Sequence, residues 1–388
     1  MRVIQVDGGE QSVRVLVEAL AAALDGGEPV LPLAANDPRA GATLRAMRPD
    51  EPVEDGTAAI VPTSGSTGTA KGVALSAHAL ASSARATHAR LGGPGRWLLA
   101  TPAHYIGGLQ VLVRSLLANA TPAVLDLGAG FDPETFAAAA APVLRDDGPR
   151  YTALVPTQLG RILDAGGAAL EAARAFDAIL IGGAATPPTL RERAEQAGIR
   201  VVGAYGMSET AGGCVYDGVP LDGVRVHVAA DGDQRIGMIA LAGDVLADGY
   251  RADDEATRAA FRHGWFHTND LGRLTADGRL EVLGRADDVI NTGGVKVPAH
   301  TVEQALLAHS GVRQVCVLGV DDAVWGEIVA AAVVPADPAA PPAQDELVEL
   351  AREAAGRAAA PKLVRLLDAL PLLGPGKVDR AAVRAAIV

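Results

Sequence analysis

A hydroxyl-rich turn with a single lysine follows the apolar run Ala58-Pro62, and it reads Thr63-Ser64-Gly65-Ser66-Thr67-Gly68-Thr69-Ala70-Lys71-Gly72. Glycines in such a turn let backbone N–H groups approach an anion, the hydroxyl side chains can donate hydrogen bonds, and Lys71 supplies a positive charge. The turn is not a Walker A loop, because alanine rather than glycine precedes Lys71. The pattern predicts a phosphate-binding loop, and a plain Ser/Thr/Gly linker is the alternative reading of the turn alone.

Around this turn, from Thr57 to about Ala204, short apolar runs alternate with helical patterns. This alternation is typical of β-α units around a parallel sheet, whose ligands bind at the carboxyl ends of the strands. Asp132 and Pro133 mark the start of one intervening helix as its cap and first residue. The predicted strands are Ala58-Pro62, Trp97-Thr101, Ala123-Asp126, Thr152-Val155, Ala178-Ile181 and Val201-Ala204.

After Gly223 the pattern changes to two-residue alternation, which predicts antiparallel strands at Val224-Val228, Ile236-Ala242 and Leu280-Leu283, the last after an Asp277-Gly278 hairpin signal. Beyond Gly284 we expect a helix, two strands and a long helix, at Thr301-His309, Val315-Val320, Ile328-Val334 and Asp345-Arg357. The predicted fold class is therefore α/β. A large N-terminal domain of parallel β-α layers plus an antiparallel β subdomain takes residues 1–286, and a small mobile α+β domain takes residues 287–388.

Composition excludes several classes of protein. The formal net charge of -12 disfavours a basic face that would track nucleic acid. Two cysteines far apart, Cys214 and Cys316, form neither a disulfide framework nor a zinc motif. The first ten residues lack the basic and apolar parts of a signal peptide, and no run is long enough to span a bilayer, so we expect a cytoplasmic protein with no membrane insertion.

The turn at 63–72 resembles the phosphate loop of the adenylate-forming superfamily, which includes the acyl-CoA synthetases, and further motifs follow in that family's order. Gly182-Gly183-Ala184-Ala185 resembles the stretch along which adenine lies. Tyr205-Gly206-Met207-Ser208-Glu209-Thr210 resembles the motif in which the tyrosine packs on adenine, the hydroxyl residue meets the α-phosphate and the glutamate binds Mg²⁺. The resemblance thus implies ATP and Mg²⁺ as cofactors, with Thr63, Ser64, Gly65, Ser66, Thr67, Gly68 and Lys71 on the phosphates.

Two later segments extend the resemblance. Gly264-Trp265-Phe266-His267-Thr268-Asn269-Asp270 resembles the motif whose aspartate binds both ribose hydroxyls, and a carboxylate can accept two hydrogen bonds from a diol. Asn269 stands where glycine is usual, and we expect its tolerance of left-handed geometry to preserve a turn there. In Gly284-Arg285-Ala286-Asp287-Asp288 the resemblance puts Arg285 on the ribose or phosphate and makes Asp287 the hinge.

The motif near the C-terminus implies how the reaction runs. Gly374-Pro375-Gly376-Lys377 resembles the segment whose lysine reaches the reacting carboxylate and the α-phosphate, where a cation offsets repulsion between two anions. The resemblance implies Lys377, Thr67, Lys71 and Glu209 as catalytic residues and Glu209 as the metal ligand. It also implies that the small domain rotates between the half-reactions and brings Gly293 and Gly294 beside the pantetheine arm of coenzyme A.

The segment from Pro102 to Leu116 resembles the substrate pocket of o-succinylbenzoate:CoA ligases of menaquinone synthesis. The short region ahead of the phosphate loop, residues 1–62, resembles the compact actinobacterial form of these ligases. On a helix beginning near Ile106, Gly107, Gln110 and Arg114 share one face, and His104 precedes it. Glycine leaves room for a ring, and Gln110 and Arg114 can hold the second carboxylate of a dicarboxylic acid. The alternative places Arg114 on a solvated face and His104 in a core niche.

Three functions follow from these motifs. The main prediction is an ATP-dependent acid:CoA ligase for o-succinylbenzoate, which forms an acyl-AMP and then the thioester. A ligase for another aryl or short-chain acid shares every ATP motif and differs only in the pocket. A non-catalytic nucleotide-binding protein is the alternative from a different class. The expected partners are small molecules, and a homodimer is left open.

Overall fold

The computed structural model describes residues 1–64, 70–145, 147–230, 236–374 and 377–388, so the predicted site residues Gly65, Ser66, Thr67 and Gly68 lie outside the described residues. The chain divides into two compact units. The first unit holds Met1–Thr186, Glu192–His227 and Ala240–His267, and the second holds Pro187–Arg191, Val228–Ile239 and Thr268–Val388. The predicted boundary between residues 286 and 287 stays a prediction.

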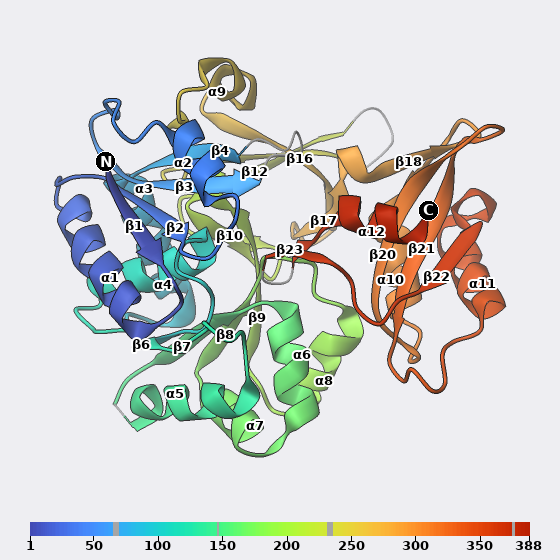
Figure 1. Ribbon diagram of the computed structural model, residues 1–388, viewed down its shortest axis with the longest axis horizontal. Coiled ribbons are helices and arrows are strands. Elements are labelled where there is room, and N and C mark those ends of the chain that lie inside the picture. Colours follow the sequence, from blue (N-terminus) through green and yellow to red (C-terminus); the bar gives the residue numbers. More distant parts are fainter. Residues whose placement is uncertain (65–69, 146, 231–235, 375–376) are drawn as a thin grey trace. The chain divides into compact units, whose positions relative to one another are not determined.

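Among the described residues, two sheets lie entirely within the first unit (Figure 1). In the first sheet the leading strands are parallel, while β4 pairs antiparallel with both β3 and β14. Its strands, in order across the sheet, are β1 (Arg2–Val6), β2 (Val30–Ala34), β3 (Thr57–Ser64), β4 (Ala70–Ser76) and β14 (Gly249–Tyr250). Strands β3 and β4, which flank the undescribed residues 65–69, are therefore antiparallel neighbours.

The second sheet has the predicted parallel β-α order, with an antiparallel edge. Strands β6, β5, β7, β8 and β9 are parallel, and β10 and β11 add antiparallel to β9. The bounds are β5 (Arg96–Leu99), β6 (Ala123–Val124), β7 (Arg150–Leu154), β8 (Ala178–Ile181), β9 (Val201–Met207), β10 (Gly212–Tyr216) and β11 (Val219–Pro220). The expectation that Ala58-Pro62 belongs to this sheet is wrong, because β3 pairs with β2 and β4 instead.

Helices α1 (Glu10–Leu24), α3 (Ala77–Leu91) and α4 (Ile106–Leu117) lie between the two sheets, since α1 and α3 contact strands of the first sheet and α4 contacts β5, β7 and β10. Helices α5 (Pro133–Arg145), α6 (Pro156–Ala165) and α7 (Gly167–Arg174) group together beside the second sheet (Figure 1). The predicted cap of α5 is confirmed, because the N–H of Thr135 donates to the Asp132 carboxylate at 2.9 Å. The other helices here are α2 (Ala40–Met47), α8 (Pro188–Gln196) and α9 (Asp254–Ala260).

Further strands follow in the chain, and β15 and β17 each pair antiparallel with β16, as predicted for this region. They are β12 (Arg225–Ala230), β13 (Gly237–Ala242), β15 (Phe261–Arg262), β16 (Trp265–Leu274) and β17 (Leu280–Arg285). The predicted hairpin at Asp277-Gly278 joins β16 to β17, with Asp270 opposite Arg285. The expectation of a left-handed turn at Asn269 is wrong: Asn269 lies inside β16, and the positive φ angles fall earlier, at His263 (53°) and Gly264 (77°).

The second unit ends in a small α+β fold. Its strands are β18 (Val289–Thr292), β19 (Val295–Pro298), β20 (Val312–Asp322), β21 (Gly326–Pro335) and β22 (Leu363–Leu366), and a short hairpin joins β23 (Leu372–Gly374) to β24 (Lys377–Val378). Its helices are α10 (Ala299–Leu307), α11 (Gln344–Ala355) and α12 (Arg380–Ile387). Among the described residues, no helix of the chain has both the length and the apolar character of a membrane span.

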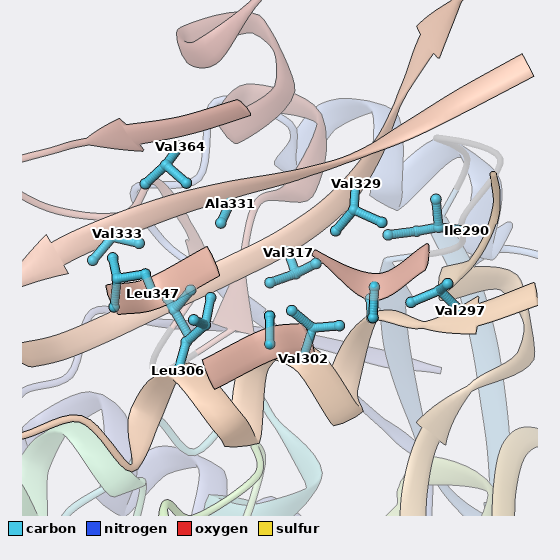
Figure 2. Close-up of a cluster of buried hydrophobic side chains, with 14 of the residues drawn as sticks. Ile290, Val297, Val302, Leu306, Val317, Val329, Ala331, Val333, Leu347 and Val364 are labelled. Carbon is cyan, nitrogen blue, oxygen red and sulfur yellow. The ribbon is translucent and has the colours of Figure 1, made fainter. Parts of the chain in front are cut away.

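Strand β20 explains why this unit has two cores. Successive side chains of a strand point to opposite faces, so Val315 and Val317 pack with α10 and α11 in one cluster (Figure 2), while Cys316 and Leu318 pack with Val383 of α12 in the other. Both faces are covered, which is why the sequence shows a continuous apolar run there instead of an alternating one.

Candidate active site

Lys71 and Gly72 lie on β4, directly after the phosphate-loop turn. The backbone N–H of Arg251 donates to the carbonyl of Gly72 at 2.7 Å, and a Cβ on Gly72 would lie 3.0 Å from that of Arg251 and against the sulfur of Met47. The guanidinium of Arg251 is buried and donates to the carbonyls of Met47, Arg48, Glu51 and Pro52. The glycine after Lys71 is therefore required by close packing.

Glu209 is carried on a tight turn, a 3₁₀ segment (Ser208–Thr210) between β9 and β10. Thr210 closes the turn, because its hydroxyl accepts from the N–H of Met207 at 3.0 Å. The carbonyl of Ala211 accepts from Ser83 of α3 at 2.9 Å, and that of Glu209 accepts from the N–H of Ala247 at 2.9 Å. These bonds fix the backbone that presents the Glu209 carboxylate at the end of a parallel strand.

Tyr250 of β14 joins Lys71 to Glu209, and the sequence motifs did not reveal it. Its phenol donates to Oε1 of Glu209 at 2.9 Å, and Nζ of Lys71 lies 5.1 Å from the centroid of its ring. Burial, followed by the charge of Glu209, raises the pKa of Tyr250, so the phenol keeps the proton that it donates. The local sequence gives little indication of this role, since Gly249 and Tyr250 merely precede the acidic start of α9.

The predicted adenine segments lie at adjacent strand ends. Gly183 and Ala184 are exposed just after β8, and Tyr205 and Gly206 belong to the neighbouring β9. A side chain at Gly206 would collide with the carbonyl oxygen of Gly212 on β10, so glycine is needed for the two strands to pair here. Ser208 is buried beside Glu209. The structure thus places Gly183 and Ala184 after the strand next to β9, which leads into Ser208 and Glu209, and their contacts with a nucleotide stay predictions.

The predicted acid pocket begins at the N-terminus of α4, which starts at Ile106 as expected. Open space surrounds the position that a Cβ of Gly107 would occupy, with no atom within 4 Å among the described residues. Gln110 is fully buried: its Nε2 donates to the carbonyl of Leu80 at 3.2 Å, and its Cγ lies 3.1 Å from the place of a Cβ on Gly212. Burial lowers the pKa of nearby His104 to about 4, so this imidazole is neutral near pH 7.

Arg114, one turn further along α4, is only 3% exposed, so the alternative that it lies on a solvated face is wrong. Its guanidinium stacks over Trp97 at 5.0 Å, and Nη2 lies 3.5 Å from the Tyr216 hydroxyl. Among the described residues no carboxylate forms an ion pair with it, and its Nε has no hydrogen-bond partner. A buried cation without a counter-ion has a strong electrostatic preference for an anion.

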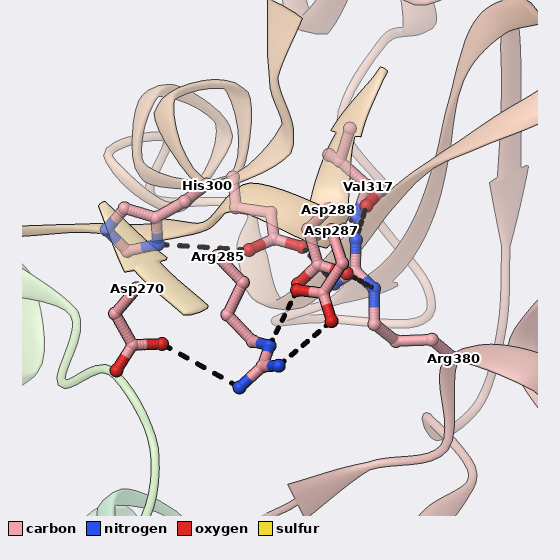
Figure 3. A network of polar contacts seen from close by, with 8 residues as sticks. Asp270, Arg285, Asp287, Asp288, His300, Val317 and Arg380 are labelled. Carbon is pink, nitrogen blue, oxygen red and sulfur yellow. Dashed lines mark hydrogen bonds and ion pairs between the residues drawn. The ribbon is translucent and has the colours of Figure 1, made fainter. Parts of the chain in front are cut away.

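In the second unit, Asp270 and Arg285 face each other across β16 and β17 (Figure 3). Nη1 of Arg285 lies 3.7 Å from Oδ1 of Asp270, while its Nε and Nη2 donate to both oxygens of Asp287 at 2.8 and 2.9 Å. The hydrogen bonds from Arg285 hold the pKa of Asp287 below its ordinary value. Arg285 is thus shared between the predicted ribose ligand and the predicted hinge residue.

The same figure shows a second arginine, Arg380, near Asp287 and Asp288. Arg380, the first residue of α12, pairs with Asp288 at 3.0 Å and with Glu303 at 3.1 Å, and it donates to the carbonyl of Val317. Asp288 directly follows Asp287, so an ion pair connects the start of the last helix to the segment that holds the predicted hinge residue.

Four further predicted site residues are Gly293 and Gly294 and, at the edges of the undescribed segments, Ser64 in the first unit and Lys377 in the second. Gly293 and Gly294 form the turn between β18 and β19, with φ of 58° and 82°, and the N–H of Gly293 donates to the carbonyl of Trp325 at 2.8 Å. The structure gives the backbone of Ser64 at the end of β3, and that of Lys377 in β24 opposite Gly374. The predicted roles of these four residues are untested.

Glu209 fits a divalent cation that arrives with a phosphate ligand. Within the described ranges, no group of three or more His, Cys, Asp or Glu side chains could hold a metal by itself. Mg²⁺ is commonly bound by one or two carboxylates plus phosphate oxygens and water, so a single carboxylate is sufficient. Tyr250 takes one oxygen of Glu209, and the second oxygen has no hydrogen-bond or ion-pair partner in the described part of the chain.

Two family models match the chain. The model for the AMP-binding enzyme matches residues 4–251, and the model for the AMP-binding enzyme C-terminal domain matches residues 301–377. The chain belongs to the AMP-binding enzyme family. Membership accounts for the order of the motifs from the phosphate loop to Lys377, and it confirms the predicted resemblance.

Among the AMP-binding enzymes, the chain is similar to several CoA ligases and synthetases. A probable 2-succinylbenzoate–CoA ligase of Mycobacterium tuberculosis is 45% identical over 98% of this chain and 97% of its own length. The o-succinylbenzoate CoA synthetase of Bacillus subtilis, solved with its acyl-adenylate intermediate, is 25% identical with a TM-score of 0.75, over 95% of this chain and 80% of that one. ATP-bound MatB of Rhodopseudomonas palustris is 28% identical with a TM-score of 0.81, over 99% and 88%.

Proposed function

We propose that the chain is an o-succinylbenzoate:CoA ligase of menaquinone biosynthesis, acting in the cytoplasm with ATP, Mg²⁺ and coenzyme A. The relative that is 45% identical across nearly the whole chain is named for this acid. The proposed chemistry rests on one observation: Lys71 and Glu209 both contact Tyr250, close to the predicted phosphate loop. A triphosphate requires a cation and a carboxylate that can bind a metal, and these two residues supply them. A homodimer remains a prediction.

In the first half-reaction, a carboxylate oxygen of the acid attacks the α-phosphorus of ATP. The bond to pyrophosphate breaks, pyrophosphate leaves with its electron pair, and an acyl-AMP forms. Lys71 and Lys377 offset the repulsion between the two anions, and the Thr63–Gly72 turn orients the phosphates. Mg²⁺, held by Glu209, supplies charge neutralisation when bound. In the second half-reaction the thiol sulfur of coenzyme A attacks the acyl carbon, AMP leaves, and the thiol proton is lost to solvent.

We assign the remaining residues within the same proposal. Gly183, Ala184, Tyr205, Gly206 and Ser208 bind the adenine and α-phosphate, and Asp270 and Arg285 bind the ribose. Residues 1–286 form the domain that binds ATP and the acid, and residues 287–388 form a mobile domain hinged at Asp287, which brings Gly293 and Gly294 to coenzyme A.

His104, Gly107, Gln110 and Arg114 form the acid pocket in this proposal. Three observations support this pocket. There is open space at Gly107, and Gln110 packs against Gly212, which follows the turn that carries Glu209. The guanidinium of Arg114 is buried and has no ion-pair partner among the described acids. A dicarboxylate offers one acid for activation and another for Arg114 to bind.

Pyrophosphate exchange over a panel of acids tests the function, followed by detection of the CoA thioester. We expect exchange with o-succinylbenzoate well above that with benzoate, 4-phenylbutyrate or hexanoate. Preference for a monocarboxylic acid would replace the assignment with another acid:CoA ligase. No exchange with any acid would favour a non-catalytic nucleotide-binding protein.

Arg114→Met separates a recognition role from a packing role. Methionine fills similar space without charge, so we expect the KM for o-succinylbenzoate to rise about tenfold while the KM for ATP stays within about twofold. Stability should stay the same or increase, because a buried charge is removed. Equal KM changes for both substrates would contradict the pocket assignment.

A further inference from the structure

Tyr250 contacts both charged groups of the phosphate site, although the proposed function gives roles only to the groups themselves. Its hydroxyl donates to Oε1 of Glu209 at 2.9 Å, and the ammonium of Lys71 lies 5.1 Å from its ring centroid. An aromatic face attracts a cation, and a phenol binds a carboxylate strongly when the site is partly buried. Lys71 and Glu209 form no ion pair with each other among the described contacts, so the tyrosine engages each charge separately.

Tyr250 is itself held in place by its neighbours. It pairs with Val73 in the register of β14 and β4, and its N–H donates to the hydroxyl of Thr257 at 2.9 Å. The ring of Phe261 packs edge-on at 5.8 Å. The next residue, Arg251, fixes the backbone through its hydrogen bonds to four carbonyls of the segment 47–52. A side chain held on so many sides can orient others, because its own rotamer is determined by packing.

We propose that Tyr250 is a positioning residue of the triphosphate site: it directs one oxygen of Glu209 toward the divalent cation and keeps Lys71 available for a phosphate. By binding Oε1, the phenol fixes the carboxylate plane and leaves Oε2 for the metal. By holding the ammonium on its ring face, it prevents Lys71 from neutralising Glu209 directly. The inference depends on the proposed function in one respect, namely that Glu209 is the metal ligand.

Direct metal binding tests the inference without relying on activity. Mn²⁺ serves as the spectroscopic probe, titrated by electron paramagnetic resonance into the full chain saturated with a non-hydrolysable ATP analogue. Removing a hydrogen-bond partner of a metal ligand typically costs about 10- to 100-fold in metal affinity. Tyr250→Phe keeps the ring and loses only the hydroxyl, so we expect Mn²⁺ to bind 10- to 100-fold more weakly while the analogue binds normally without metal.

Two further variants separate the hydroxyl from the ring. Tyr250→Leu should lose Mn²⁺ affinity as Tyr250→Phe does and should also weaken binding of the analogue without metal, because Lys71 loses its aromatic support. Tyr151→Phe is the matched control, since its hydroxyl donates to the carbonyls of Leu91 and Gly93 elsewhere in the same unit, and it should behave as the unmodified chain.

The outcomes distinguish the two proposals. High Mg²⁺ should restore the kcat of Tyr250→Phe in pyrophosphate exchange, whereas a purely structural role would lower kcat at every Mg²⁺ concentration and overturn the inference. Unchanged Mn²⁺ affinity in folded Tyr250→Phe would also overturn it. If that variant does not fold, Tyr250→His, which keeps a ring and a donor, must retain metal affinity for the inference to stand. An unmodified chain that binds Mn²⁺ as expected but exchanges pyrophosphate with no acid would refute only the proposed function.

Discussion

The two polar clusters of the molecule use their charges in different ways. In the first unit, Lys71 and Glu209 each contact Tyr250, and a neutral side chain separates opposite charges. In the second unit, Arg285 binds Asp287 through two nitrogens and lies near Asp270, and Arg380 binds Asp288 and Glu303. The first cluster leaves its charges available for a ligand, whereas the second uses most of its charges to connect β17, the segment Ala286–Asp288, α10 and α12.

The difference predicts the largest effect on catalysis from the first cluster, an effect on ATP binding from Asp270 of the second cluster, and an effect mainly on stability from the Arg380 ion pairs. Charges that are already paired with each other attract a ligand less strongly, because a ligand must compete with the existing partner to use them. Charges that face an aromatic ring or a phenol keep most of their attraction for a counter-ion. The following three substitutions test this contrast.

The largest effect should follow Glu209→Gln, which removes the carboxylate charge but keeps the size of the side chain. We expect kcat/KM for adenylation to fall about 10²- to 10³-fold, because charge stabilisation at the phosphates is lost. Pyrophosphate exchange with varied Mg²⁺ measures it. Glu171→Gln on α7, an exposed glutamate paired with Arg174, is the control and should be unaffected. A fall below about threefold for Glu209→Gln would place the metal elsewhere.

An intermediate effect should follow Asp270→Asn. Hydrogen bonds to a charged group contribute roughly 1.5–3 kcal/mol, so we expect the KM for ATP to rise about tenfold to a hundredfold with little change in the KM for the acid. Steady-state kinetics with each substrate varied in turn measures the difference. Asp277→Asn in the neighbouring hairpin, where the aspartate pairs with Arg279, should change neither KM. A change confined to the acid KM would remove Asp270 from the nucleotide site.

The smallest effect on activity, and the clearest on stability, should follow Arg380→Met. Its loss leaves Asp288 and Glu303 without their cation, so we expect local opening free energies near α12 and β20 to fall by about 1–3 kcal/mol. Hydrogen exchange of these segments measures the change. Lys71→Met should change the opening free energies measured by hydrogen exchange by less than about 0.5 kcal/mol throughout the first unit. The reason is that the Lys71 ammonium forms no ion pair with a described acid. Equal destabilisation by both variants would remove the contrast between the clusters.

Much of the fold followed from local patterns. Strand β8 has the predicted bounds, Ala178 to Ile181, because a short apolar run between turn signals leaves little choice. The assignment of β3 was wrong because alternating strands and helices do not reveal which strand pairs with which, and β3 forms an antiparallel hairpin with β4. Asn269 was also misjudged, since pairing of β16 with β17 keeps its backbone extended where a turn was expected.

The candidate site was predictable to the extent that its residues stand in motifs. The chemistry of the hydroxyl-rich turn indicated Lys71, whereas Glu209, Asp270 and Arg285 were indicated by the resemblance of their segments to motifs of the adenylate-forming superfamily. Tyr250 was missed, because it meets Glu209 from 41 residues away through the pairing of β14 with β4, and a two-residue strand leaves almost no sequence pattern. The burial of Arg114 was likewise invisible, since an arginine within an apolar helix can face either solvent or the core.

The amino-acid sequence alone determined the family, the order of the motifs and the kinds of chemical groups that the chain offers to a nucleotide and an acid. The tertiary structure decided how these charges are partnered: Lys71 and Glu209 with Tyr250, Arg285 with Asp287, and Arg114 with Trp97 and Tyr216 but no described acid. The reason is physical. Residue type and local spacing act over a few positions of the chain, whereas hydrogen bonds and ion pairs depend on distances of about 3 Å, set where distant strands and helices pack together.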